Sequence, residues 1–98
     1  HAASNRPRVT FEFPQVNVSY PESSRIYTRL RIESAYPATQ ATFFFNNVYL
    51  GTATAHPLAF SFVPQEVGIT ADTNILKTIV TDAVGNKTEA STVVNLTR

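Results

Sequence analysis

Apolar and polar side chains alternate along most of this chain, and the alternation has the period of a β-strand. Residues 25–33 show it most clearly: the even positions are aliphatic or threonine, and the odd positions are charged or tyrosine. Because successive side chains of a strand point to opposite faces, this segment predicts a strand with one dry and one wet face. No segment of eleven or more residues has the i, i+3, i+4 spacing of an amphipathic helix. The pattern therefore predicts an all-β chain.

Turn residues divide the alternation into short segments. Pro14 ends the first one, since proline cannot donate to a strand ladder, and Asn46-Asn47 resembles a tight hairpin turn because asparagine tolerates positive φ. Gly85 supplies a left-handed residue in the last turn, where Asp82 can accept hydrogen bonds from turn amides. Strands are predicted at residues 8–13, 16–20, 25–33, 41–46, 48–54, 58–63, 74–82 and 87–96.

Without a helix to cover a sheet, two sheets must cover each other. The prediction is a β-sandwich of seven to eight antiparallel strands, with no disulfide because the chain has no cysteine. The inward positions of the predicted strands should form its core: Val9, Phe11, Ile26, Leu30, Ile32, Phe43, Phe45, Leu50, Leu58, Phe60, Leu76, Val80, Val94 and Leu96.

Length and composition agree with one folded domain. The 98 residues are 43% hydrophobic and 15% charged, which suits a single packed core. A formal net charge of +1 gives no electrostatic argument for nucleic acid, and no apolar run is long enough to insert into a membrane. His1-Ala2-Ala3-Ser4 resembles the remnant of an affinity tag. We therefore expect residues 1–5 to be a tag remnant or linker and residues 6–98 to form the single domain, cut from a longer protein.

Two stretches of the chain carry motifs that belong together. The first runs from Phe43-Phe44-Phe45-Asn46-Asn47 through Leu50-Gly51-Thr52 to Pro57-Leu58-Ala59-Phe60-Ser61-Phe62. The second is Val80-Thr81-Asp82-Ala83-Val84-Gly85-Asn86. Together they resemble bacterial immunoglobulin-like domains of multimodular surface, secreted and cell-wall-associated proteins. The resemblance covers about residues 9–97; it departs from the family pattern at Asn47, where glycine is usual, and in the long connection over residues 66–74.

The resemblance implies that the sandwich is an immunoglobulin-like β-sandwich and that it serves as a non-catalytic, extracytoplasmic accessory module. Such modules serve as spacers, adhesion units or docking units whose partners are the adjoining domains of the parent protein. In the turn at residues 82–86, it implies a structural role for Asp82, Gly85 and Asn86. Because one fold carries many functions, any binding role has to be argued from a site.

Catalytic and metal sites find little support in the residues. His56 is the credible catalytic histidine, yet it stands before Pro57 with no nucleophile elbow in the chain. Paired carboxylates would have to come from Glu12, Glu33, Glu66 and Asp72, which we expect to be solvated. Asp72 and Asp82 are isolated in sequence, so no metal site is predicted. The expectation is that the chain is not an enzyme and needs no cofactor.

The wet face of the strand at 25–33 is the first candidate site. Arg25, Tyr27, Arg29 and Arg31 would form an aromatic and cationic stripe, with residues two apart separated by roughly 6.5 to 7 Å. The stripe could bind carbohydrate, such as a cell-wall polysaccharide or another anionic glycan. The alternative is simple cross-strand pairing, in which Glu12 and Glu33 offset the arginines.

Phe44 is the second candidate. If Phe43 and Phe45 face the core, Phe44 points outward, near Tyr49 across the hairpin. An exposed aromatic on a sheet face can mark contact with a neighbouring domain or a ligand. It can equally be covered by a side chain of the adjacent strand.

Overall fold

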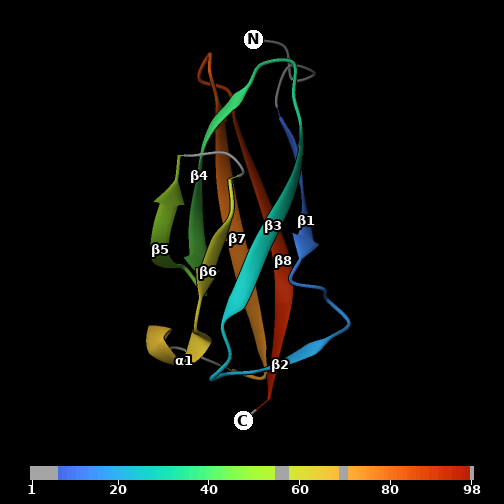
Figure 1. The fold of residues 1–98 in the computed structure, drawn as a ribbon, viewed down its shortest axis with the longest axis vertical. Coiled ribbons are helices and arrows are strands. Elements are labelled where there is room, and N and C mark those ends of the chain that lie inside the picture. The colour runs from blue at the N-terminus through green and yellow to red at the C-terminus, as the bar shows by residue number, and fades with distance from the viewer. Residues whose placement is uncertain (1–6, 55–57, 69–70, 98) are drawn as a thin grey trace.

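Two β-sheets pack face to face in the computed structural model, which describes residues 7–54, 58–68 and 71–97 (Figure 1). The smaller sheet has the strand order β1 (Arg8–Phe13), β3 (Ile26–Glu33), β6 (Phe60–Phe62). The larger has the order β2 (Ser19–Pro21), β8 (Lys87–Thr97), β7 (Thr73–Asp82), β4 (Ala38–Phe45), β5 (Val48–Ala53). This arrangement confirms the predicted β-sandwich.

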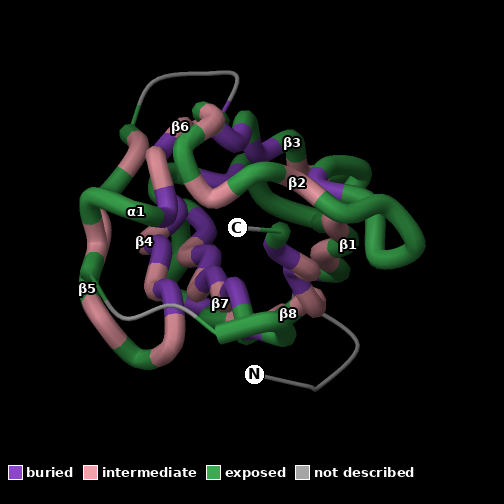
Figure 2. Tube along the Cα trace, turned by 90° about the horizontal axis from the view of Figure 1, so that it is seen from below, coloured by how far each residue is buried: buried purple, intermediate pink, exposed green. Residues whose placement is uncertain are grey.

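The core forms where the inward positions of the two sheets meet. Buried positions alternate with more exposed ones along β4 and β7, as Figure 2 shows. One cluster contains Ile26, Phe45, Phe62, Leu76, Val94 and Leu96, and the other contains Ala38, Ala41, Phe43, Leu58 and Val80. The other predicted core residues are half-buried and pack against these clusters: Val9, Phe11, Leu30, Ile32, Leu50 and Phe60.

Both long hairpins turn where the sequence pattern places them. Asn46 and Asn47 join β4 to β5 with φ values of 50° and 67°, the left-handed pair that a two-residue hairpin requires. Gly85 has φ +88° between β7 and β8. The predicted ends of these four strands lie within one residue of the observed ones, except that β4 begins at Ala38 instead of residue 41.

The second predicted strand is wrong in position and direction. β2 covers Ser19–Pro21 rather than residues 16–20, and it pairs parallel to β8 instead of antiparallel. Val16 and Val18 are 57% and 38% exposed, so the apolar residues on which this strand was predicted do not point into the core. The segment crosses from one sheet to the other here, and Asn95 Nδ2 donates to Val16 O at 2.7 Å to hold it.

The predicted strand at 58–63 is also shorter than expected. β6 holds Phe60–Phe62, and a one-turn helix, α1 (Pro64–Val67), follows it. Pro64 lies in the first turn of α1, where a missing N–H costs nothing, and Gly68 ends the helix with φ +86°. The all-strand expectation missed this turn because four residues are too few to show a helical period.

Candidate functional site

The four residues of the predicted stripe belong to the outer face of the smaller sheet. Arg25 precedes β3, and Tyr27, Arg29 and Arg31 lie on it at alternate positions. All four are exposed, and Tyr27 is 68% exposed. Thr28, on the opposite face of β3, is buried; its Oγ1 donates to Phe60 O at 2.7 Å and accepts from Phe60 N at 2.9 Å.

Two of the arginines have carboxylate partners. Arg29 Nε lies 3.2 Å from Glu12 Oε1 on β1, and Arg31 Nε lies 3.5 Å from Glu33 Oε1 on β3 itself. These side chains are 42% to 70% exposed. Exposed pairs of this kind contribute about 0–1 kcal/mol each, so they leave the arginines available to a stronger partner.

Arg25 is different from the other two. Its Nη1 donates to Ser61 Oγ on β6 at 3.2 Å, and it forms no salt bridge with any carboxylate of the described residues. Arg25 is thus hydrogen-bonded without a salt bridge to a described carboxylate, and Glu66 lines a neighbouring pocket with it.

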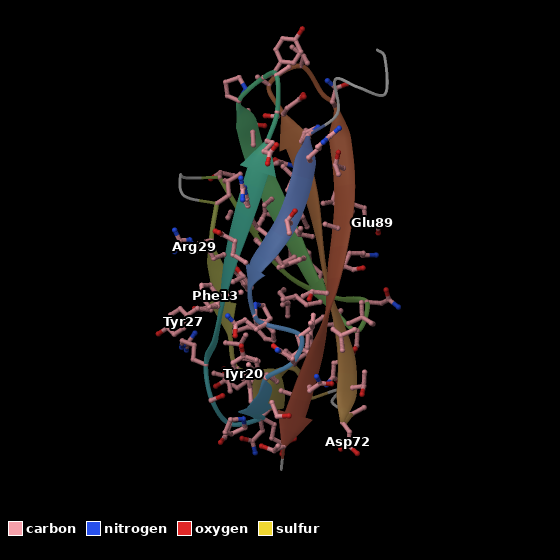
Figure 3. The ribbon with its side chains drawn as sticks, turned by 90° about the vertical axis from the view of Figure 1, so that its right-hand side faces the viewer. Phe13, Tyr20, Tyr27, Arg29, Asp72 and Glu89 are labelled. Atoms are coloured by element: carbon pink, nitrogen blue, oxygen red, sulfur yellow. The ribbon has the colours of Figure 1, made fainter. Side chains whose placement is uncertain are left out.

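A cleft of about 560 Å³ opens beside these residues. It is lined by residues 25–29 together with Phe13, Tyr20 and Ala59. Figure 3 shows Phe13, Tyr20, Tyr27 and Arg29 on one side of the molecule. The site therefore has three aromatic rings and two arginines.

Sequence reasoning missed Phe13 and Tyr20. Alternation places Phe13 on the same face as Phe11, but the register of β1 shifts between these residues, so that Phe13 lies opposite Arg29 and is 42% exposed. Glu12 is the extra residue between these two pairings, and a bulge of this kind re-aims the side chain that follows it. Tyr20 lies on β2, which follows the crossing of the chain from the smaller sheet to the larger one, and its hydroxyl accepts from Gln15 N at 3.1 Å.

The second candidate lies on the larger sheet, where Tyr49 lines a second pocket that shares Arg25 with the cleft. Phe44 and Tyr49 meet edge to face with ring centroids 5.9 Å apart. Lys77 Nζ lies 5.0 Å from the centroid of the Phe44 ring and 3.3 Å from Glu89 Oε1. Figure 3 places Glu89 on the side away from Tyr27 and Arg29. Phe44 is half-buried, so a neighbouring strand covers much of it, while Tyr49 is 58% exposed.

The turn at residues 82–86 has a buried carboxylate. Asp82 Oδ1 accepts from Val84 N at 3.0 Å and from Asn86 N at 2.8 Å, and Oδ2 accepts from Asn86 Nδ2 at 2.9 Å. Burial acts to raise the pKa of Asp82, but the hydrogen bonds from Asn86, Val84 and Gly85 outweigh it, so that the pKa lies below its ordinary value of 3.8. The carboxylate is thereby committed to holding the turn.

The residues considered for catalysis are scattered. Glu12 and Glu33 are on the outer face of the smaller sheet, Glu66 is in α1, Asp72 is exposed just before β7, and His56 lies outside the described residues. No three potential metal ligands gather anywhere in the described part of the chain. Nor is any helix of that part long and apolar enough to cross a membrane.

Comparisons of sequence give no relative: no family model matches the chain, and no curated protein matches it. Solved structures do match. A chain of the fibronectin(III)-like modules of CbhA from Clostridium thermocellum superposes with a TM-score of 0.76 at 14% identity, over 93% of this chain and 46% of that one. The spore cortex lytic enzyme SleM of Clostridium perfringens matches with a TM-score of 0.61 at 9% identity, over 89% of this chain and 26% of that one.

The chain has a fibronectin(III)-like, immunoglobulin-like β-sandwich fold. It spans less than half the length of either matching chain. At these identities the likeness shows the fold alone.

Proposed function

We propose that this chain is a non-catalytic module of a larger extracytoplasmic protein, where it spaces the adjoining domains and docks a partner. The observation that carries the proposal is the path of the chain through the sandwich. β1 begins near one end of the long axis and β8 ends near the other, as Figure 1 shows, and the domain measures 44 × 22 × 20 Å. Domains attached at Arg8 and Thr97 would be held apart by the long dimension.

The chemistry of the described residues supports a non-catalytic role. The carboxylate of Asp82 accepts hydrogen bonds from turn donors, and Glu12 and Glu33, which do not line the cleft, are exposed and paired with arginines. Catalytic acids and bases usually line a cleft, and no acidic residue lines the one described above. The fold likeness to fibronectin(III)-like modules, found within a longer chain, agrees with a module role.

The test exchanges the module inside its parent protein. A spacer can be replaced by an unrelated immunoglobulin-like module of similar length, whereas a short flexible linker should lower the function of the parent. If the module docks a partner, its replacement should release that partner from the parent protein or change where the parent protein is located. Full parental function after deletion of residues 6–98 would contradict both roles.

The second candidate function is binding of carbohydrate or of an anionic cell-wall polymer. The observation that favours it is the cleft, with the exposed rings of Phe13 and Tyr27 beside Arg25 and Arg29. Sugar rings stack on aromatic faces, and guanidinium groups pair with carboxylate or phosphate. Binding to tetragalacturonate or to poly(glycerol phosphate) that disappears in an Arg29→Ala/Arg31→Ala variant with its fold intact would support it.

A further inference from the structure

One half of β3 lacks a strand neighbour along one edge. β6 pairs with Ile26–Thr28, but β1 pairs with β3 from Glu33 only as far as Arg29. Pro14 follows Phe13, and the chain then leaves the smaller sheet and joins the larger one as β2. Within the described part of the chain, residues 25–28 therefore have no strand along the edge that β1 occupies farther on.

The cleft lies against this unpaired stretch. Five consecutive residues, 25–29, line it. Since successive side chains of a strand point to opposite faces, a cleft that contacts all five must meet the backbone as well as the side chains. Unpaired strand backbone is a template for pairing with another extended chain.

The walls of the cleft define the side chains that it would accept. Phe13 and Tyr27 offer exposed rings for apolar contact. Arg25 forms no salt bridge with a described residue, and none of the residues that line the cleft is acidic. The complementary segment is extended and carries both apolar residues and a carboxylate.

We propose that this cleft binds an extended acidic peptide segment of a partner protein, which adds as a strand beside residues 25–28 of β3. The proposal rests on the docking role proposed above and names its site and its ligand class. Backbone hydrogen bonds supply affinity in this mode, and alternate side chains supply specificity. The free strand edge favours a peptide over a glycan, because stacking of sugars needs the rings but makes no use of a strand edge.

The experiment selects peptides of about ten residues, a usual upper length for a strand, from a random display library on the whole 98-residue chain. Peptides enriched on this chain should carry Asp or Glu between apolar residues. Titration of an enriched peptide into ¹⁵N-labelled protein should shift the amide signals of residues 25–29 and Phe13. N-methylation of alternate peptide nitrogens should abolish binding, while methylation of the intervening nitrogens should leave it nearly unchanged.

Matched variants locate the site. Arg25→Gln/Tyr27→Ala should weaken binding by about tenfold or more, because a cation and an aromatic anchor are both removed. Tyr36→Ala/Lys87→Gln removes an exposed ring and a cation from residues that do not line the cleft, and it should leave the affinity unchanged. Both variants replace exposed side chains, and their circular dichroism and unfolding curves establish that they fold.

Several outcomes would overturn the proposal. The first is a library that yields no peptide bound more tightly to this chain than to the Arg25→Gln/Tyr27→Ala variant. The second is a titration in which the amide signals that shift belong only to other strands. The third is binding that no pattern of N-methylation weakens. Preference of the cleft for tetragalacturonate or poly(glycerol phosphate) over every selected peptide would also overturn it, in favour of glycan binding. If an unrelated module of the same length replaces this one without loss in the parent, docking fails while spacing stands.

Discussion

Gly51 lies against the ring of Phe60, so closely that a Cβ at position 51 would come within 2.8 Å of Phe60 Cε1. Phe60 in turn stacks on Phe43, with ring centroids 5.3 Å apart and an angle of 15° between the planes. This contact joins β5 and β6, the edge strands of the two sheets. The absent side chain at position 51 is thus a packing requirement.

Gly51→Ala should therefore destabilise the domain by about 1–3 kcal/mol, the usual cost of overpacking. Because the chain has no tryptophan, urea denaturation followed by far-UV circular dichroism measures the change in the free energy of unfolding. In a Phe60→Leu background the cost of the alanine should fall, because the atom that it meets is gone. Equal costs in the two backgrounds would show that the ring of Phe60 is not the obstacle.

Asn74 is buried at the start of β7 and uses its whole amide. Its Oδ1 accepts from Asn46 Nδ2 and Ala71 N, both at 2.9 Å, and its Nδ2 donates to Ala71 O at 2.8 Å and Val94 O at 3.2 Å. Asn74→Ala should cost about 2–4 kcal/mol, since it leaves several groups without a partner. Asn95→Ala, which removes one bond to Val16 O, serves as control and should cost about 1 kcal/mol. Similar losses for the two variants would contradict the network.

Asp82 should make the domain sensitive to acid. Because its pKa is lower in the folded state, its contribution to stability is present above the unfolded pKa and is lost as the pH falls through the folded one. The free energy of unfolding should therefore drop as the pH falls below about 4, the ordinary range of an aspartate. Asp82→Asn should be less stable at neutral pH and should show less of this acid loss than Asp72→Asn, which replaces an exposed carboxylate. If the free energy of unfolding falls equally at acidic pH in the two variants, Asp82 does not have this role.

The pair between Arg29 and Glu12 should contribute little to stability. A double-mutant cycle with Arg29→Gln and Glu12→Gln should give a coupling below about 1 kcal/mol, because both side chains are exposed. The coupling should vanish at about 1 M salt, where charges on the surface are screened. A coupling well above this value would mean that Arg29 is held in place and is a poor partner for a ligand.

Much of the fold follows from side-chain alternation. β3, β7 and β8 are long enough to show the two-residue period, and asparagine and glycine mark the hairpin turns between β4 and β5 and between β7 and β8. The outward positions of Arg25, Tyr27, Arg29 and Arg31 follow from the same period. These features are local, so the sequence is sufficient to predict them.

The cleft depends on relationships that are not local. Phe13 joins it because of a register shift in β1, and Tyr20 joins it because the chain crosses between the sheets from β1 to β2. The network of Asn74 likewise joins residues from three segments. Neither bulges nor sheet switching have a sequence period, which is why alternation placed the arginines but missed the aromatic rings beside them.

The division of β3 between two partners underlies both the sandwich and the proposed docking site. Interstrand nuclear Overhauser effects test it most directly. We expect contacts between β1 and β3 that start at the pair Arg8–Glu33 and end at the pair Phe13–Arg29. We also expect contacts between Ile26–Thr28 and β6, and none between residues 14–18 and residues 25–28. Cross-strand contacts between residues 14–18 and 25–28 would mean that this edge is already paired, and would contradict the account.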